Sequence, residues 1–283
     1  MKIGIIFFGL PRCSALTVPS IQNFIIDELK KHELFIESCL SLQTSVLNVR
    51  SDENHQIEDI NYDFFRSYPH QFIEPDSLLD MKLHAELLRF GDAWEDNGAS
   101  LRNLLLQLAS MQKAYLNCKK NECDFYIFVR PDLIIQDPIP LQNFISRFAD
   151  KHAIMLPGWQ WFKGVNDRFA IASKSAADAY GLRYDHLLSF CRNSHRPIHS
   201  ERFLSSQLSS HQIIIKTCTT RMSRVRASCQ ARDEVFSVVR RMGGFKCALH
   251  AQLGQVVWSQ KLIGLTQIVM YYLTKPFKKA IRF

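Results

Sequence analysis

The sequence predicts an α/β fold with a mostly parallel central sheet flanked by helices. The chain opens on a continuous apolar run from Ile3 to Phe8, which is typical of a strand buried on both faces. A helical pattern and a second strand pattern follow, giving a βαβ unit. The order of helix and then strand returns between Leu101 and Val129, which again favours a parallel sheet.

The βαβ opening is read from its turn and capping residues. The first strand stops at Gly9, and either Thr17 or Ser20 can cap the helix that follows. A second strand is expected from His32 to Cys39. Residues 49–77 are charged and irregular, and we expect them to form a loop or insertion over the edge of the sheet. The apolar face of the first helix comprises Ile21, Phe24, Ile25 and Leu29.

The later elements are read from periodicity and from β-branched content. Helices are expected over Leu101–Leu116, Phe144–Phe148, Ser175–Tyr180 (capped by Ser173) and Glu201–Leu208. Strands are expected over Asp124–Val129, Ala153–Leu156, Phe169–Ala172 and His211–Thr217.

The charge is concentrated in the last quarter of the chain. Of 35 basic and 27 acidic residues, 13 and two lie between Lys216 and Phe283, and the net charge is +8. Because no glycine-rich or serine-rich linker divides the chain, we expect one domain over residues 1–230 and a basic, amphipathic extension over 231–283. The extension is either a solvated surface or a contact with anionic lipid or a lipid-phosphate acceptor. Nucleic acid is not expected, since no binding motif accompanies the charge.

Neither the carboxyl-terminal segment nor the amino terminus has the pattern of a targeting or spanning segment. Lys261 and Lys275 interrupt the apolar residues after Val256, which favours an interfacial helix over a membrane span. The opening residues lack the cleavage pattern of a signal peptide. We therefore expect a cytoplasmic protein, with peripheral contact to the inner face of a membrane as an option. The eight cysteines are expected to be reduced, and Cys118 and Cys123 have no second pair that would complete a zinc site.

A turn with the chemistry of a phosphate site follows the first strand. Open α/β sheets bind ligands at the carboxyl ends of their strands. Gly9 would let the backbone approach such a ligand, and Arg12 offers a planar fork that matches a pyrophosphate. The alternative is a tight turn with a surface arginine.

A second motif follows the central strand. Pro131 cannot donate to a strand ladder and holds Arg130 extended, so Arg130 and Asp132 should lie where the strand leaves the sheet. Asp132 could hold a divalent cation that bridges two phosphates, and Arg130 could neutralise the same phosphates. The alternative is a structural salt bridge between the two residues.

These two motifs resemble those of GT-A glycosyltransferases, in which an apolar strand ends in Asp-x-Asp. Here Arg130-Pro131-Asp132 stands in that place. The chain more closely resembles a bacterial and viral group of nucleotide-sugar transferases that open with Phe-Phe-Gly-x-x-Arg and carry Arg-Pro-Asp. The resemblance covers roughly residues 1 to 230, although Ile36–Cys39 departs from the His-x-Trp ending of that group. The matching stretches are Phe7–Arg12, Arg130–Asp132, Asn166–Ser173, His199–Glu201 and Arg224–Arg226.

The resemblance implies a GT-A domain, a Rossmann-like nucleotide-diphospho-sugar transferase fold, and a donor site. It implies that Arg12 contacts the donor pyrophosphate and that Asp132 binds a metal or a donor hydroxyl. Gly9, Arg130 and Asn166 complete the donor-binding set. Mn or Mg is a candidate cofactor, but metal dependence is open because the first carboxylate of Asp-x-Asp is replaced.

Four further residues are candidates for the transfer step or the acceptor. Asp167 is either a ligand for a sugar hydroxyl or part of an Asn-Asp turn. Glu201 is either a general base or an acid that favours the start of a helix. Trp159 and Trp161 could stack on an acceptor sugar from one side of an extended loop, or pack in the core.

The function expected is therefore transfer of a sugar, in the manner of a hexosyltransferase, from a nucleotide sugar to a glycan or glycolipid acceptor in surface polysaccharide biosynthesis. Two alternatives stay open. One is a nucleotide-sugar-binding protein that does not catalyse. The other is a basic adaptor that binds membranes or nucleic acid through its tail.

Overall fold

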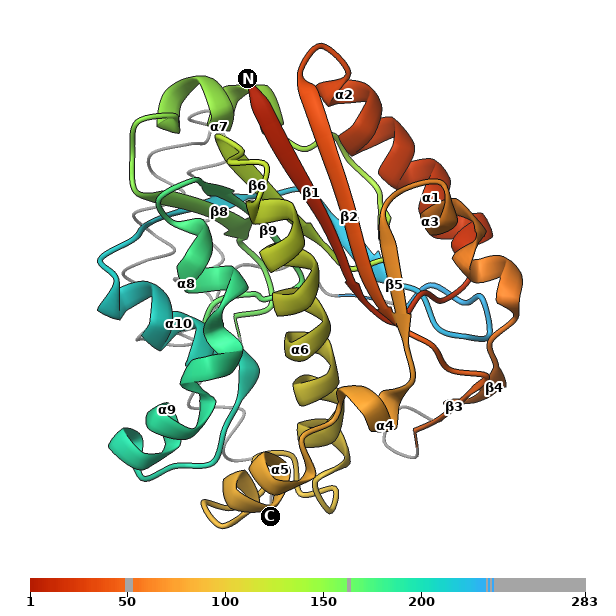
Figure 1. Ribbon diagram of the computed structural model, residues 1–283, viewed down its shortest axis with the longest axis vertical. Helices are drawn as coiled ribbons and strands as arrows, with labels where there is room; N and C mark the ends of the chain where they lie inside the picture. Colours follow the sequence, from red (N-terminus) through yellow and green to blue (C-terminus); the bar gives the residue numbers. More distant parts are fainter. Residues whose placement is uncertain (49–52, 162–163, 233, 235, 237–283) are drawn as a thin grey trace, which may run out of the picture.

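A seven-stranded sheet forms the centre of the protein in the computed structural model (Figure 1), which describes residues 1–48, 53–161, 164–232, 234 and 236. Its strand order is β10-β8-β9-β6-β1-β2-β5. All neighbours run parallel except β9, which is antiparallel to both β6 and β8. The predicted fold class, a mostly parallel sheet flanked by helices, is confirmed. The strands are β1 (Lys2–Gly9), β2 (Glu33–Ser41), β5 (His70–Ile73), β6 (Phe125–Val129), β8 (Ala153–Pro157), β9 (Phe169–Ser173) and β10 (Ile214–Cys218).

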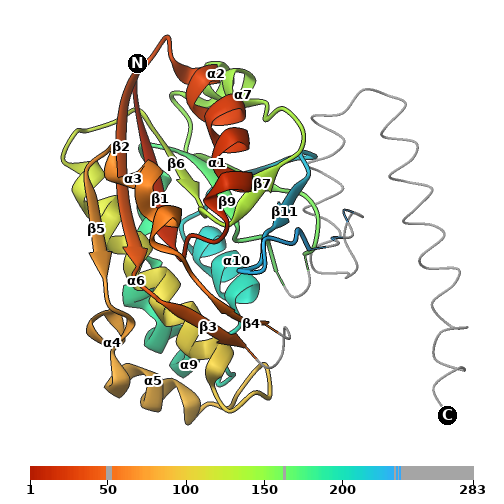
Figure 2. The same ribbon diagram turned by 90° about the vertical axis from the view of Figure 1, so that its right-hand side faces the viewer.

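Helices cover both faces of the sheet (Figures 1 and 2). Alternate residues of β1 enter two separate cores, with Ile6 and Phe8 in one and Ile5 and Phe7 in the other. The first core is closed by α6 (Ala99–Lys119), α8 (Ala177–Gly181), α9 (Leu187–Ser194) and α10 (Ser200–Ser210). The second is closed by α1 (Ser14–Ile21), the π-helical turn η1 (Gln22–Ile26), α2 (Asp27–Leu29), α3 (Asp63–Arg66) and α7 (Leu141–Phe148).

Short strands and helices lie around the edge of the sheet at which β1 and β6 end. β3 (Ser45–Asn48) and β4 (Glu53–Gln56) form a hairpin, and β7 (Leu133–Ile135) pairs with β11 (Met222–Arg224) so that Leu133 faces Arg224. The β7–β11 pair brings two segments far apart in sequence next to each other. The other short helical elements are η3 (Asp59–Tyr62), α4 (Pro75–Leu78), α5 (Met81–Leu88) and η4 (Arg183–His186).

Two expectations about the first third of the chain are wrong. Residues 49–77 contain β5, the edge strand of the sheet, as well as β4 and α3, and are not simply a loop. The helix after β1 begins at Ser14, so Thr17 and Ser20 lie inside it and do not cap it. The Oγ of Ser20 instead accepts a hydrogen bond from the backbone N–H of Ile135.

The basic extension expected over residues 231–283 lies almost wholly outside the described residues. The described part of it packs on the domain, since Glu234 is buried and Phe236 contacts the Trp159 ring edge-on. Within the described ranges, no helix has the length and hydropathy that crossing a membrane requires.

Candidate functional site

The carboxyl ends of β1 and β6 meet where the order of strands reverses. β2 and β5 extend the sheet on one side of β1, and the chain then returns to place β6 on the other side. Because Phe7 pairs with Val129, the turns that follow these two strands leave the sheet at the same edge. Open α/β sheets bind ligands in the crevice at such a reversal.

Gly9 ends β1 and begins the first of these turns. Its φ of 95° is a conformation that other residues adopt only with strain. Its N–H donates a hydrogen bond to Oγ of Ser110 in α6 at 3.0 Å, which ties the turn to that helix. A Cβ at this position would meet no atom within 4 Å, so the backbone here borders open space.

The structure brings Arg12, Arg130 and Asp132 together, as the sequence predicts. Arg130 donates from Nε to Oδ1 of Asp132 at 2.9 Å and from Nη2 to Oδ2 at 2.7 Å. Arg12 donates from Nη1 to Oδ2 at 3.0 Å. The side chain of Asp132 is 2% exposed, whereas those of Arg12 and Arg130 are 15% and 17% exposed. The carboxylate of Asp132 is therefore the most buried part of the cluster, and the side chains of both arginines are partly exposed.

These ion pairs shift the pKa values of Asp132 and Arg130. Burial alone would raise the pKa of Asp132, but Arg130 and Arg12 outweigh burial and lower the pKa to about 2. Burial would lower the pKa of Arg130, but Asp132 and the nearby Asp167 raise it above its usual value. Both groups are charged at neutral pH, so Asp132 acts as an anion that orients two arginines.

A divalent cation does not fit Asp132 in this arrangement. Mg²⁺ and Mn²⁺ need several oxygen ligands, and three N–H donors from two arginines already occupy the oxygens of Asp132. The part of the chain that the structure describes holds no group of three or more His, Cys, Asp or Glu side chains able to bind a metal ion. The expected Mn or Mg site at Asp132 is thus not supported by the residues around it.

Helix α6 adds a polar side chain to the cluster. Oε1 of Gln107 accepts a hydrogen bond from Nη1 of Arg130 at 3.0 Å. Its Nε2 is buried and has no hydrogen-bond partner among the described residues. Leaving a buried donor unpaired costs about 1 to 3 kcal/mol, so this atom would gain from an acceptor supplied by a ligand.

A second group of charged side chains lies beside Asp132 through the β7–β11 pair. The carbonyl oxygen of Asp132 accepts a hydrogen bond from the N–H of Val225 at 2.8 Å, which fixes the position of Arg224. Nε of Arg224 donates to Oε1 of Glu234 at 3.3 Å, and Nη1 of Arg168 lies 3.0 Å from the same oxygen. Two arginines therefore share one oxygen of a single buried carboxylate.

Positive charge is incompletely neutralised around Arg224. Its burial, and then the neighbouring Arg168 and Arg130, lower its pKa to about 9, and Glu234 opposes them only in part. Burial is the largest of these effects, and a further anion would offset the part that comes from Arg168 and Arg130.

Asn166 and Asp167 occupy the turn that leads into β9. Oδ1 of Asn166 accepts from the N–H of Arg168 at 3.0 Å, and its Nδ2 donates to the carbonyl of Trp159 at 3.1 Å, so its side chain organises the loop. The carbonyl of Asp167 accepts from the Tyr180 hydroxyl at 2.7 Å. The carboxylate of Asp167 is close enough to Arg130 to raise the pKa of that residue. Asp167 therefore belongs to the electrostatic environment of the site.

Trp159 and Trp161 are buried, with 2% and 3% of their surface exposed. Nε1 of Trp159 donates to the carbonyl of Thr220, and Nε1 of Trp161 donates to that of Pro157, both at 2.8 Å. The rings lie in different cores on the two faces of the sheet. Gln160 between them has a φ of 53°, which breaks the extended backbone that would have aligned the rings. They pack in the core, which is the second of the two roles that the sequence left open.

Glu201 lies in the first turn of α10 and pairs with the residue that caps this helix. Its Oε2 is 2.9 Å from Nδ1 of His199, and its side chain is 16% exposed. The His199 ring stacks on Trp94 with ring centroids 5.3 Å apart. Among the described residues, the side-chain partner of Glu201 is His199, whereas those of Asp132 are Arg12 and Arg130, so the two carboxylates share no partner.

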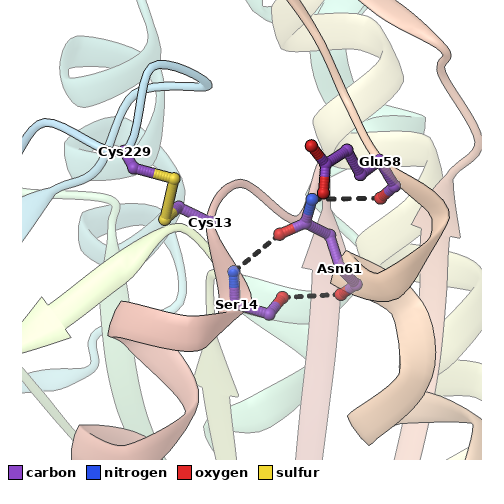
Figure 3. The surroundings of a disulfide bond; sticks show 5 residues. All are labelled: Cys13, Ser14, Glu58, Asn61 and Cys229. Carbon is purple, nitrogen blue, oxygen red and sulfur yellow. Dashed lines mark hydrogen bonds between the residues drawn. A yellow bond between two sulfur atoms is a disulfide. The ribbon is translucent and has the colours of Figure 1, made fainter.

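A disulfide links the turn of Arg12 to the hairpin that follows Arg224 (Figure 3). Cys13 is bonded to Cys229, 216 positions later. Next to it, the N–H of Ser14 donates to Oδ1 of Asn61 at 2.7 Å and its hydroxyl donates to the Asn61 carbonyl at 2.6 Å. The expectation of reduced cysteines is wrong for this pair. The other described cysteines are buried thiols: Cys39, Cys118, Cys123, Cys191 and Cys218.

Sequence reasoning missed Gln107, Arg168 and Glu234, and gave Arg224 no role. Gln107 lies within the regular pattern of α6, which carries no sign of the site, whereas Arg168 follows Asp167 in a stretch that the sequence did single out. Glu234 could have been noticed as one of only two acidic residues in a segment with 13 basic ones. The position of Arg224 depends on β11, which is three residues long and too short to recognise from its sequence.

Comparisons with known proteins give distant structural likenesses. No protein-family model matches the chain, and no curated protein matches it. Mouse xyloside xylosyltransferase 1 in its apo form is similar over 77% of this chain and 85% of its own, at 10% identity and a TM-score of 0.44. Core-mannan synthase A from Aspergillus fumigatus in its Mn/GDP form is similar over 87% of this chain and 82% of its own, at 7% identity and a TM-score of 0.45.

Proposed function

We propose that this protein is a glycosyltransferase of the GT-A type, which moves a sugar from a nucleoside-diphosphate sugar to a glycan or glycolipid acceptor in surface polysaccharide synthesis. One observation carries the proposal: Arg12, Arg130 and Arg224 converge around Asp132 at the strand reversal between β1 and β6. Guanidinium forks match the oxygens of phosphate groups, and a strand reversal is where open α/β sheets bind nucleotides.

The arginines would assist departure of the nucleoside diphosphate. In the transfer, the acceptor hydroxyl oxygen bonds to the anomeric carbon, a general base takes the hydroxyl proton, and the bond between that carbon and the β-phosphate oxygen breaks with its electron pair going to the diphosphate. Negative charge then develops on the phosphate oxygens. Arg12 and Arg130 are held in place by Asp132 before the substrate arrives, so they would stabilise that charge without reorganising.

Two carboxylates would serve the sugar and the acceptor. We assign Asp167 to a sugar or acceptor hydroxyl, because its charge acts on Arg130 at the proposed phosphate site. We assign Glu201 as the general base of an inverting transfer, with His199 orienting its carboxylate from 2.9 Å. Asn166 would contribute to donor binding by holding the loop that carries Asp167.

A thermal-shift panel of UDP-, GDP-, dTDP- and CMP-sugars, with and without Mn²⁺, tests the proposal on the full chain. A ligand at 100 times its Kd stabilises a protein by about 2.7 kcal/mol, which corresponds to about 5 to 10 °C in Tm for a chain of this size. We expect one of the three nucleoside-diphosphate sugars to give such a shift, and Asp132→Asn to abolish it; CMP-sugars carry a single phosphate and should not give it.

The matched control for that panel is Asp137→Asn. Asp137 also pairs with an arginine through two hydrogen bonds, from Nε and Nη2 of Arg221 at 2.8 and 2.7 Å, but at a more exposed place. The ligand should raise the Tm of Asp137→Asn by as much as it raises the Tm of the unmodified chain. If no nucleotide sugar raises the Tm, or if Asp132→Asn responds normally, the proposal is wrong.

A second candidate is a protein that binds nucleotide sugars without transferring them. The observation that favours it is that Arg12 and Arg130 already engage both oxygens of Asp132. The arginines could then bind a diphosphate while Asp132 takes no part in a transfer step. Donor hydrolysis and transfer, measured beside binding, separate the two candidates. Binding without release of nucleoside diphosphate would favour the second.

A further inference from the structure

The charged side chains at the strand reversal indicate whether the site binds its diphosphate ligand with or without a metal ion. This inference rests on the proposed function. Asp132, the residue in the place of a metal ligand, is 2% exposed and lies beneath its arginines. The side chains of Arg12, Arg130 and Arg224 are each 15 to 22% exposed. A ligand that approaches from solvent therefore has access to the arginine side chains but little access to the carboxylate.

The carboxylate of Asp132 has no free oxygen with which to bind a cation. Arg130 and Arg12 direct three N–H groups at its two oxygens, over 2.7 to 3.0 Å. A divalent cation bound there would have to displace at least one of these charge-assisted hydrogen bonds and would face the positive charge of both arginines. The residue two positions before Asp132 is Arg130, so this position holds a cation and not a second carboxylate that could help to bind a metal.

The nearby carboxylates do not complete a metal site. Oε1 of Glu234 lies within 3.3 Å of both Arg224 and Arg168, and its Oε2 accepts a hydrogen bond from Nε2 of Gln160. Asp167 acts electrostatically on Arg130. In the described part of the chain, no three acidic, histidine or cysteine side chains gather as metal ligands would.

The balance of charge favours an anion instead. Among the described residues of the site, four arginines lie near three carboxylates, which favours an anionic ligand over a cationic one. Arg224 is only weakly neutralised among the described residues, because its ion pair with Oε1 of Glu234 is 3.3 Å long and Arg168 shares that oxygen at 3.0 Å. The arginines are Arg12, Arg130, Arg168 and Arg224, and the carboxylates are Asp132, Asp167 and Glu234.

We propose that this site binds the diphosphate of its ligand without a divalent cation, with Arg224 as a third phosphate-binding arginine beside Arg12 and Arg130. The guanidinium groups supply the positive charge that a bridging metal would otherwise supply. Arg224 reaches the site from the hairpin that the Cys13–Cys229 disulfide holds against the Arg12 turn. Gln107 adds a neutral donor through its unpaired Nε2.

Calorimetric titration of the full chain with UDP, GDP and dTDP, in EDTA and in millimolar Mn²⁺, tests this directly. We expect one nucleotide to bind in EDTA with a Kd within about threefold of its value in Mn²⁺, and inorganic pyrophosphate to compete with it. Binding that needs Mn²⁺, with affinity falling by about tenfold or more in EDTA, would overturn the inference and leave the proposed function standing. Failure of every nucleotide to bind in either condition would remove the proposed function, and this inference with it.

Variants of Arg224 test its part in binding. Because a hydrogen bond to a charged group is worth about 1.5 to 3 kcal/mol, Arg224→Ala should raise the Kd in EDTA by about 10- to 100-fold. Arg224→Lys keeps the charge and should recover part of the affinity. Arg221→Ala removes a surface arginine three positions away and should leave the Kd unchanged. If Arg224→Ala does not fold, Arg224→Lys and the EDTA titration decide; a folded Arg224→Ala with normal affinity contradicts the assignment.

Discussion

Replacing Asp132 by asparagine should destabilise the protein without abolishing its fold. The substitution removes the charge that pairs with Arg12 and Arg130, and leaves both guanidinium groups facing a neutral amide. Arg130 and Arg12 lower the pKa of Asp132 from its ordinary value near 4 to about 2. One pKa unit corresponds to about 1.4 kcal/mol, so the charged form of Asp132 contributes about 2 to 3 kcal/mol to the free energy of unfolding at neutral pH.

The pH dependence of that contribution has a definite sign. The pKa is lower in the folded state, so the stabilisation is fully present above the unfolded value near pH 4 and is lost as the pH falls from about 4 to about 2. The difference in free energy of unfolding between the native chain and Asp132→Asn should therefore shrink over this window.

Urea denaturation of the native chain, Asp132→Asn and Asp137→Asn at pH 7, repeated at acid pH, measures these quantities. Asp137→Asn breaks a more exposed pair with Arg221, which water screens, so it should cost much less than Asp132→Asn. Equal stability of Asp132→Asn and the native chain at pH 7 would refute the argument. So would a difference that does not change with pH.

Three other substitutions have predictable effects. Gly9→Ala should cost about 1 to 3 kcal/mol, measured by urea denaturation, because its φ of 95° strains any side chain; a neutral change would contradict this. Cys229→Ser should lower the free energy of unfolding by about 2 to 5 kcal/mol and weaken nucleotide binding, because it frees the hairpin from Cys13; reductant should then have little further effect. Trp159→Phe should lower the Tm through loss of the hydrogen bond to Thr220, while leaving donor and acceptor affinity unchanged, and a selective loss of acceptor affinity would restore the stacking role.

The central strands could be predicted from sequence because each is apolar throughout. Every residue of β6, β8 and β9 is buried, so local composition is enough to mark them as strands buried on both faces. β5 could not be predicted in this way. Its residues, His70–Ile73, are partly or fully exposed at the edge of the sheet, and only pairing with β2 makes them a strand.

The candidate site was predictable where a residue follows closely after a buried strand. Arg12, Arg130 and Asp132 do so, and the rule that ligands bind at carboxyl ends of strands is sufficient to group them. The pairing of Glu234 with Arg168 and Arg224 depends on how distant segments pack, which spacing does not encode. The orientation of Trp159 and Trp161 could not be predicted either, because the positive φ of Gln160 between them directs their rings to opposite faces of the sheet.

Release of nucleoside diphosphate from nucleotide sugars, measured for the full chain and two arginine variants, tests the central claim most directly. The claim is that Arg130 stabilises the departing diphosphate at the strand reversal. The native chain and Arg221→Ala should release diphosphate from one donor class at equal rates, and Arg130→Ala should be slower by about 10²- to 10³-fold. Release by Arg130→Ala at the native rate, or no release from any donor, would contradict the account.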